Sequence, residues 1–251
     1  MPHSPATIMA VFSHPDDETV AGPLLARYAA EGHHVRLFTV TSGEAGVTAN
    51  LPAGVRLGAA REEELRRACA CLGIDEPLFG GFPDGGIHSR DVQDRLSRAL
   101  VDVFGSLRPD IVITWGGDGA TGHPDHRVTG AVASQVFQSL GTSRKLYFAA
   151  APASLFSGFS SPDEPLESLV RILGRYPVAD KYITTVVDCR AWLDEAGRAI
   201  RCHRTQWNNE RMRAFDAINR ELLGGKVYLR LALADTPIPA PMSETDIMAG
   251  L

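Results

Sequence analysis

Short runs of apolar residues alternate with longer segments of helical periodicity along the first 150 residues of the chain. The runs predicted to be buried strands are residues 8–12, 35–40, 78–79, 111–115 and 145–149. The segments predicted to be helices, with apolar residues at three- and four-residue spacing, are residues 19–32, 59–72, 92–107 and 124–140. Strands that alternate with helices form parallel sheets through right-handed crossovers. The pattern therefore predicts an α/β fold with a mostly parallel sheet.

The alternation weakens after residue 150. Residues 151–165 are rich in Ser, Pro and Phe and are predicted to form a surface loop. The elements predicted beyond this loop are a strand at 184–187, helices at 192–208 and 212–223, an edge strand at 227–232 and an extended tail from 236. The chain has no internal repeat and no low-complexity linker, so we expect a single domain. Its expected parts are a core of residues 1–150, a C-terminal part of residues 151–235 that completes the domain, and an extended tail of residues 236–251.

The composition argues against several classes of partner. The chain has 251 residues, a formal net charge of −5 and a pI of about 5.9, which argue against a nucleic-acid-binding surface. It has no basic run and no apolar segment long enough to span a bilayer, and its first residues lack the features of a signal peptide. Its four cysteines form no C-x-x-C pair and are expected to be reduced thiols of a cytoplasmic protein. A homo-oligomer stays open.

Two acidic clusters that contain histidine follow buried strands. Residues 13–18, S-H-P-D-D-E, come directly after the strand at 8–12, and residues 123–126, H-P-D-H, follow the loop after the strand at 111–115. Open α/β sheets bind ligands at the carboxyl ends of their strands, so the two clusters are expected to meet there. Because neighbouring carboxylates repel one another, a divalent metal ion is the simplest group that would hold them together.

The spacing within each cluster suits metal binding. His14 and Asp17 are three residues apart at a helix start and share a face, whereas Asp16 points elsewhere. His123 and His126 have the same spacing. Two histidines and one carboxylate form a catalytic zinc site with a position left for water, and a free carboxylate can act as the base. Each cluster alone also fits a simpler interpretation, as acids at a helix N-terminus or as a capping pair of histidines.

Residues 10–18, A-V-F-S-H-P-D-D-E, together with residues 122–126, G-H-P-D-H, resemble the PIG-L/LmbE family of zinc-dependent deacetylases. Residues 203–206, H-R-T-Q, are similar to the late H-x-S-Q segment of that family, with threonine in place of serine. The resemblance extends from near residue 7 to residue 210. It implies a Rossmann-like fold with helices on both faces of the sheet and one Zn²⁺ ion per chain, with iron or cobalt as alternatives. It also implies hydrolysis of the N-acetyl group on a glucosamine unit.

By position, His14, Asp17 and His126 resemble the zinc ligands of the family. Asp16 resembles the general base, and His123 resembles the histidine that acts as general acid. The resemblance implies that Asp16 removes a proton from the attacking water and that His123 protonates the leaving amine. The products would be acetate and a free amino sugar. The expected partner is therefore a small-molecule substrate with an N-acetylated amino sugar.

Three further residues are carried over by the same resemblance. Asp125 resembles the carboxylate that orients His123. Arg61 resembles an arginine that contacts the aglycone side of the substrate. Asp84 lies in a glycine-rich loop, residues 80–86, where a family aspartate can hold sugar hydroxyls. The alternatives are that Arg61 is a solvated helix residue and that Asp84 bonds only its own turn.

Other functions stay open on the sequence alone. An amidase of the same family acting on a thiol conjugate fits the same residues, and a sugar-binding module would keep the site without turnover. Residues 117–122, G-D-G-A-T-G, match the G-x-G-x-x-G pattern of dinucleotide-binding oxidoreductases, although H-P-D-H occupies the helix start that a pyrophosphate needs. Two histidines and a carboxylate also describe non-haem iron oxygenases. The regions expected to select the substrate, residues 47–57 and 151–180, do not identify a ligand.

Overall fold

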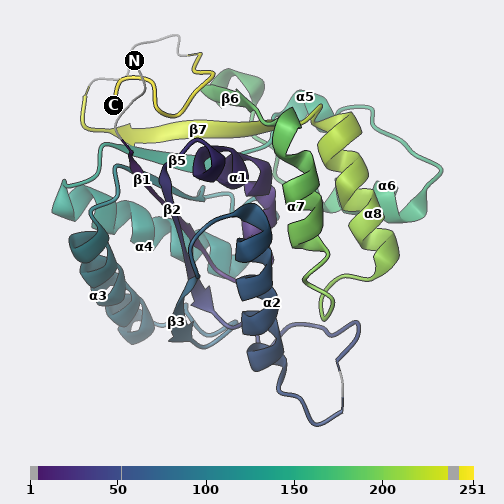
Figure 1. Cartoon of the computed structure of the whole chain (residues 1–251), viewed down its shortest axis with the longest axis horizontal. Helices are drawn as coiled ribbons and strands as arrows, with labels where there is room; N and C mark the ends of the chain where they lie inside the picture. Colours follow the sequence, from purple (N-terminus) through teal and green to yellow (C-terminus); the bar gives the residue numbers. More distant parts are fainter. Residues whose placement is uncertain (1–4, 52, 237–242) are drawn as a thin grey trace.

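The computed structural model describes residues 5–51, 53–236 and 243–251. Seven strands form one sheet in the order β3-β2-β1-β4-β5-β7-β6 (Figure 1). All neighbours are parallel except β7, which runs antiparallel to β5 and β6. The strands are β1 Thr7–Phe12, β2 His34–Thr41, β3 Leu78–Phe82, β4 Ile111–Trp115, β5 Lys145–Ala149, β6 Thr185–Asp188 and β7 Lys226–Ala234. The predicted α/β fold with a mostly parallel sheet is confirmed.

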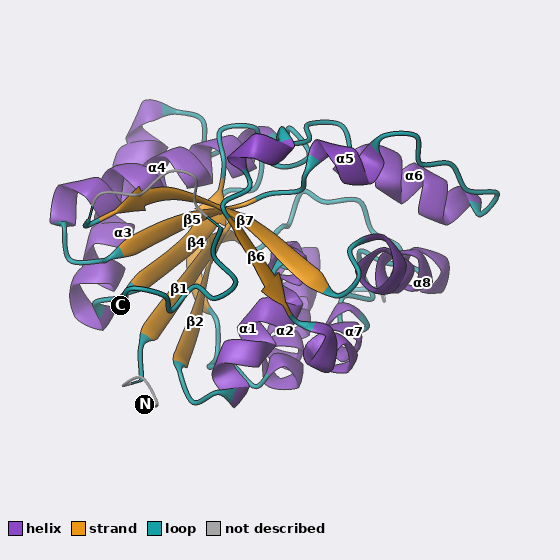
Figure 2. Ribbon diagram, turned by 90° about the horizontal axis from the view of Figure 1, so that it is seen from above, coloured by secondary structure: helices purple, strands orange, loops and turns teal. Residues whose placement is uncertain are grey.

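Helices cover both faces of the sheet, as predicted. Helices α1, α2 and α7 lie on one face and α3 and α4 on the other (Figure 2). A smaller cluster of buried residues joins α6 and α8 beside the sheet. The helices are α1 Gly22–Ala30, α2 Leu57–Leu72, α3 Arg90–Leu107, α4 Pro124–Leu140, α5 Ala153–Phe156, α6 Glu164–Leu173, α7 Leu193–Ile200 and α8 Asn209–Ala217, which continues into a π-helical turn, Ile218–Leu222.

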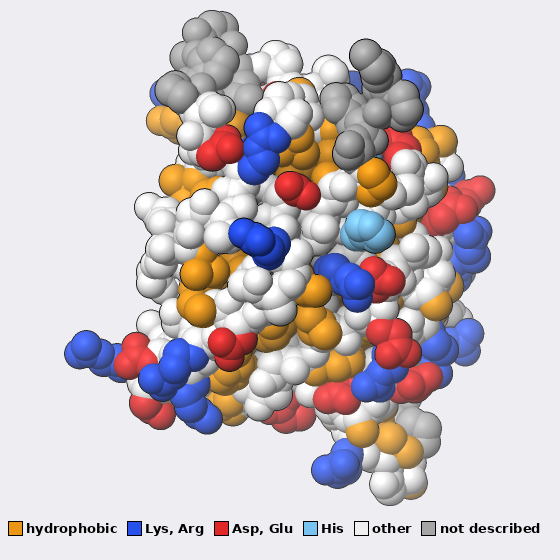
Figure 3. All heavy atoms as spheres, turned by 60° about the vertical axis from the view of Figure 1, so that its left-hand side comes forward, with side chains coloured by type: hydrophobic (Ala, Val, Ile, Leu, Met, Phe, Trp, Pro, Cys, Tyr) orange, Lys and Arg blue, Asp and Glu red, His pale blue; other side chains and the backbone are white. Residues whose placement is uncertain are grey.

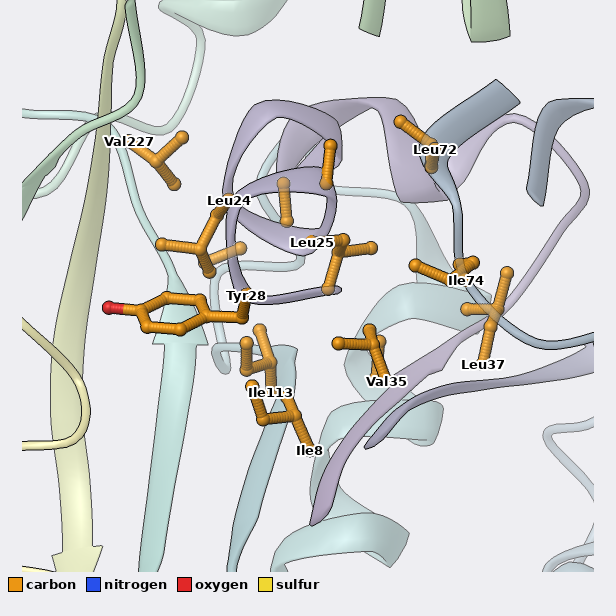
Figure 4. Packing of buried hydrophobic residues seen from close by; sticks show 14 of the residues in the cluster. Ile8, Leu24, Leu25, Tyr28, Val35, Leu37, Leu72, Ile74, Ile113 and Val227 are labelled. Carbon is orange, nitrogen blue, oxygen red and sulfur yellow. The ribbon is translucent and has the colours of Figure 1, made fainter. Parts of the chain in front are cut away.

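Central strands of this sheet are apolar at most positions because both of their faces are buried. In β1, Ile8 and Phe12 pack toward the helices of the α1 face, and Met9 and Val11 pack toward α3 and α4. Figure 4 shows side chains of α1, among them Tyr28, next to Ile8 on the sheet. This two-sided burial explains why the sequence shows continuous apolar runs rather than alternation.

The segment after β1 differs from the prediction of one helix at 19–32. A 3₁₀ turn, Asp17–Val20, comes first, and α1 begins only at Gly22, with Pro23 in its first turn. Proline suits that position because the first helical N–H needs no partner within the helix. The early turn leaves the first cluster on a tight bend rather than on a regular helix.

Three predictions for the C-terminal half are wrong. The predicted loop at 151–165 contains α5, and α6 begins at its end, where the side chain of Asp163 accepts a hydrogen bond from Leu166 N–H. The predicted helix at 192–208 ends at Ile200, so the H-R-T-Q segment lies in turns. The predicted edge strand is β7, which pairs on both sides and lies inside the sheet.

Part of the expected tail, residues 237–242, lies outside the described residues. The described part, residues 243–251, packs against the body of the protein. Glu244 pairs with Thr185 of β6, and Ile247 and Met248 are buried in the core of the α1 face. The division of the chain into core, C-terminal part and tail stays a prediction.

The surface carries mixed charge. Basic and acidic side chains are interspersed over the face shown in Figure 3, in keeping with the small net charge of −5. Among the described residues, no helix has the length and apolar character needed to cross a membrane.

Candidate metal and catalytic site

The two clusters predicted from the sequence meet at the carboxyl ends of β1 and β4, which are parallel neighbours in the middle of the sheet. The Nε2 atom of His126 lies 3.2 Å from Oδ1 of Asp17. The ring centroid of His14 is 4.8 Å from that of His123 and 5.3 Å from that of His126. The sheet therefore assembles one site from segments that are far apart in the sequence.

The backbone of the first cluster separates its two aspartates. Asp16 has a φ of 100°, a left-handed conformation that is costly for a residue other than glycine. Asp17 starts the 3₁₀ turn, and its Oδ2 accepts hydrogen bonds from the backbone N–H groups of Ser13 and His14, each at 2.9 Å. The bend turns the Asp17 carboxylate toward the histidines, whereas Asp16 meets other partners.

The second cluster lies at the start of α4. His123 caps the helix, and its Nδ1 accepts the backbone N–H of Asp125 at 3.2 Å, which places the proton of the neutral ring on Nε2. The Nδ1–H of His126 donates to the carbonyl of Gly119 at 3.0 Å. The ring of His126 also stacks on Trp115, with centroids 4.3 Å apart and planes 5° from parallel. These contacts fix the His126 ring and leave its Nε2 for a metal ion.

Three carboxylates surround His14. Oδ1 of Asp84 and Oδ2 of Asp125 lie 3.1 and 3.3 Å from its Nε2. Oδ2 of Asp17 lies 3.5 Å from its Nδ1. Burial lowers the pKa of His14, but the hydrogen bonds with the carboxylates outweigh burial and raise the pKa to about 12. This surplus of negative charge favours a cation, and a divalent metal ion would neutralise it in place of the proton.

The side chains fit such an ion. Two groups of side chains each bring three donor atoms within 4.8 Å of one another. One group is His14, His123 and His126, and the other is His14, Asp84 and Asp125. Histidine nitrogen and carboxylate oxygen are ligands that zinc takes. Burial raises the pKa of Asp17, but His126 and His14 hold it well below the usual range, so this carboxylate is ionised. That His14, Asp17 and His126 are the ligand set stays a prediction.

Two side chains hold the carboxylate of Asp16. A guanidinium N–H of Arg61 donates to Oδ1 at 3.1 Å, and the Nε1–H of Trp207 donates to Oδ2 at 2.8 Å. Burial raises the pKa of Asp16 and the charge of Asp17 adds to the increase, although Arg61 and Trp207 oppose it. A carboxylate with a raised pKa is suited to accept a proton, in keeping with the predicted role of Asp16 as base.

The two residues predicted to contact the substrate both bond to the protein itself. Arg61 is only 4% exposed and donates to the carbonyls of Gly43 and Pro15 as well as to Asp16. The interpretation of Arg61 as a solvated helix residue is therefore wrong. Asp84 pairs with His14 and accepts a backbone hydrogen bond with its other oxygen. Contact of Arg61 or Asp84 with a substrate stays a prediction.

The carboxylate of Asp125 contacts His14 and the backbone of the glycine-rich loop. It is fully buried, and its Oδ2 accepts the N–H of Gly85 at 2.9 Å beside Nε2 of His14. Its hydrogen bond with His123 runs through the backbone N–H instead. The structure thus joins the Asp125 side chain to His14. That Asp125 orients His123 stays a prediction.

Two buried side-chain contacts hold the segment after α7, residues 203–207, next to the site. Nε2 of His203 pairs with Oε1 of Glu18 at 2.6 Å, and both side chains are fully buried. Thr205 donates from its N–H and its Oγ1 to the carboxylate of Glu64, at 2.9 and 2.7 Å. Both contacts position Trp207 against the first cluster. Sequence reasoning missed Trp207, although it directly follows the H-R-T-Q segment that the family resemblance marks.

The G-D-G-A-T-G loop, residues 117–122, contacts the second cluster and holds His126. The carbonyl of Gly119 accepts from His126, and His123 occupies the cap position of α4. Gly119 and Ala120 both have positive φ, which tightens the turn before the helix. The helix start that a pyrophosphate would use is taken by the histidines. These contacts do not support the dinucleotide-binding interpretation.

The fold and the cluster at its carboxyl edge define an α/β protein with a histidine–carboxylate site. Residues 9–137 match the PIG-L family, described as GlcNAc-PI de-N-acetylase. The chain belongs to this family, as the resemblance predicted. A 1D-myo-inositol 2-acetamido-2-deoxy-α-D-glucopyranoside deacetylase of Thermomonospora curvata is 33% identical to it over 97% of this chain and 96% of that protein.

Two solved structures share the fold. The N,N'-diacetylchitobiose deacetylase of Pyrococcus horikoshii matches with a TM-score of 0.60 and 21% identity, over 90% of this chain and 84% of that chain. The 4-carboxy-2-hydroxymuconate hydratase of Pseudomonas putida KT2440 matches with a TM-score of 0.64 and 17% identity, over 93% and 99% of the two chains. Because proteins named for different reactions share it, the fold alone does not decide the chemistry.

Proposed function

We propose that this protein is a zinc-dependent N-deacetylase, which hydrolyses the acetamide of a GlcNAc-containing small molecule to acetate and a free amine. The observation that carries the proposal is the pairing of Asp17 with His126 and His14, beside a second carboxylate, Asp16, that meets other partners. One carboxylate is thus available to a metal ion and the other to a proton. The exposed His123 completes the set with an acid.

The relatives support this reaction over hydration. The curated relative from Thermomonospora curvata is named for removal of an acetyl group from an acetamido sugar, and it covers nearly the whole chain at 33% identity. The hydratase shares only 17% identity. A hydrolytic deacetylation needs water, a base and an acid, and the described site supplies side chains for both proton transfers.

The metal ion that fits the donor set is Zn²⁺, with iron or cobalt as alternatives. His14, Asp17 and His126 would hold it. When bound, zinc lowers the pKa of a water ligand and polarises a carbonyl oxygen. The carboxylates of Asp84 and Asp125 would hold His14 in place through its Nε2 side, as carboxylates do for ligating histidines.

The proton transfers follow from the positions of the side chains. Asp16 would take a proton from the attacking water, and the hydrogen bonds from Arg61 and Trp207 would keep its carboxylate in one orientation. His123, in its protonated form, would deliver a proton from Nε2 to the leaving nitrogen as the C–N bond breaks. In that form Nδ1 also carries a proton, so the contact in which Nδ1 accepts the Asp125 N–H belongs to the neutral ring. Water and the amide are consumed, and acetate and the amine are formed.

The test combines metal content with turnover. Wild type purified without added metal should carry close to one equivalent of zinc and release acetate from a panel of N-acetylglucosaminides, with activity lost to a chelator and restored by zinc. His126→Ala should lose both zinc and activity. His34→Ala, an exposed histidine at the opposite end of the sheet, is the matched control and should keep both.

Asp16→Asn separates the two roles of the first cluster. This variant should keep its zinc, because Asp16 is not among the proposed ligands, and its kcat should fall about 10²- to 10⁴-fold with the loss of the base. Full activity of Asp16→Asn on a verified substrate would contradict the proposed mechanism. Zinc binding that is unchanged in His126→Ala would contradict the ligand assignment.

A further inference from the structure

A cavity of about 90 Å³ lies between the sheet and the helices of the C-terminal half. Its walls are mainly apolar and come from the ends of β4 and β5, from β7, and from α5, α6 and α8 with the π-helical turn. Side chains that line it include Trp115, Ala151, Phe156, Val178 and Phe215. The roles proposed above for the catalytic residues do not use this space.

The cavity shares walls with the candidate site. Val20, which lines it, is the last residue of the 3₁₀ turn that begins with Asp17. Trp115, which also lines it, stacks on the ring of His126. Ala120 contributes from the loop whose Gly119 carbonyl holds His126. Both segments that carry the clusters therefore border the cavity.

Tyr176 joins the cavity to the surface next to the second cluster. It lines the cavity and is 38% exposed. Its ring packs so closely on Gly122 that a Cβ at Gly122 would lie 2.1 Å from Cε2 of the tyrosine. The guanidinium group of Arg127 lies over the Tyr176 ring, with its central carbon 5.4 Å from the ring centroid. The rim of the cavity is thus packed directly against the residue before His123.

We propose that this cavity is a subsite for an apolar substituent of the substrate, a hydrocarbon group of a few carbons attached to the amino sugar. This inference rests on the proposed function and narrows its substrate class. Mainly apolar walls favour hydrocarbon over hydroxyl groups, because a buried hydroxyl needs a hydrogen-bond partner and most of the lining side chains offer none, the exceptions including Asp118, Asn219 and Lys226. The substrate in the name of the Thermomonospora curvata relative joins a sugar to inositol, which is a polyol, so the subsite would distinguish this chain's substrate from that one.

The first experiment compares methyl and hexyl N-acetyl-β-glucosaminide as substrates. Each buried methylene is expected to strengthen binding about fourfold, so the KM of the hexyl compound should be at least about tenfold lower than that of the methyl compound. Ala151→Leu and Val178→Phe narrow the cavity from different segments and should bring this ratio close to one while methyl turnover persists. Ala70→Leu adds the same side chain on the exposed side of α2 and should keep the wild-type ratio.

The second experiment does not depend on catalysis. Hexyl and methyl β-glucoside lack the acetamide, and their affinities can be compared by calorimetry for wild type and the same variants. At least tenfold tighter binding of the hexyl compound, lost in both cavity-filling variants, would support the subsite even if no acetate were released. Equal affinity of the two compounds for wild type would overturn the subsite, whereas absence of acetate release alone would count only against the deacetylase.

Discussion

The indole Nε1–H of Trp207 donates a 2.8 Å hydrogen bond to Oδ2 of Asp16, from a segment 191 residues further along the chain. The other oxygen of the same carboxylate accepts from Arg61. The two donors hold the carboxylate from opposite oxygens and so fix its direction. The late H-R-T-Q segment thereby acts on the first cluster through Trp207, which neither cluster contains.

Trp207→Phe should lower kcat by about 10- to 100-fold and change KM less than about threefold. Loss of one hydrogen bond to a charged group accounts for that range. The bond orients the proposed base and does not bind substrate, so the effect belongs in kcat. Steady-state kinetics on a verified N-acetylglucosaminide would measure the two constants. Trp192→Phe, at a half-buried tryptophan before α7, is the control and should change neither. An effect confined to KM would contradict the positioning role.

Gly130→Ala should destabilise the protein by about 2 kcal/mol, in the range of overpacked cores. Gly130 lies in α4, and a Cβ there would be 2.1 Å from the carbonyl oxygen of Trp115. Because the obstacle is backbone, α4 must move away from β4 and carry His126 with it. Zinc affinity should therefore fall as well. Urea unfolding and metal titration would measure the two effects.

The control for that prediction is another glycine inside a helix. Gly105 lies in α3, and a Cβ there would meet nothing within 4 Å. Gly105→Ala should therefore stabilise the protein by about 0.5 to 1 kcal/mol, since alanine restricts the unfolded chain more than glycine does. A destabilisation of similar size in both variants would show that the close approach of α4 to β4 is not the cause.

The strands and the meeting of the two clusters could be predicted because their signals are local. The run at 111–115 is apolar except for Thr114, since both faces of β4 are buried, and the clusters follow β1 and β4 in sequence. The contacts inside the site could not be predicted in the same way. That the side chain of Asp125 bonds His14, whereas only its backbone N–H bonds His123, depends on how α4 packs beside β1, which no spacing within one segment reveals.

The C-terminal half was harder to predict for two different reasons. For α6 the sequence does contain a helical signal after the capping Asp163. Apolar residues recur there at helical spacing, namely Leu166, Leu169, Val170 and Leu173. The Ser, Pro and Phe content of the preceding residues favoured a loop instead. For β7 the strand itself was predicted, but no local signal marked its position inside the sheet. Its place between β5 and β6 is set by antiparallel pairing with distant strands, so its sequence resembles that of an edge strand.

Glu244→Ala should cost about 3 kcal/mol of unfolding free energy. Nζ of Lys145 lies 2.6 Å from Oε1 of Glu244, and Oε2 accepts from Tyr147 and Thr185, in a site that is less than 10% exposed. Removing Glu244 leaves the buried charge of Lys145 without its counterion, which is costly even though neighbouring oxygens still accept hydrogen bonds from it. Chemical unfolding would measure the loss. The exposed pair of Arg144 and Asp235 is the control.

That control pair is 3.2 Å apart, but its side chains are 36% and 42% exposed. Solvent screens such a pair, so Asp235→Asn should change stability by less than about 1 kcal/mol. If both substitutions had the same small effect, the described end of the chain would not depend on the buried ion pair. In that case Ile247 and Met248, which pack into the core, would have to hold it.

His203→Gln should remove a pH-dependent contribution to stability. Burial lowers the pKa of His203, but the charge of Glu18 and the hydrogen bond with it outweigh burial and raise the pKa above its ordinary value of 6.5. A group whose pKa is raised on folding stabilises the protein fully below its unfolded pKa, and this contribution is lost as pH rises through the folded pKa. The stability difference between wild type and His203→Gln should therefore be largest below about pH 6.5 and shrink at higher pH. Urea unfolding from pH 5.5 to 9 in the presence of a chelator would measure it without a contribution from bound metal. A difference that grew with pH would mean that the imidazole is neutral in the fold and that its contact with Glu18 is not an ion pair.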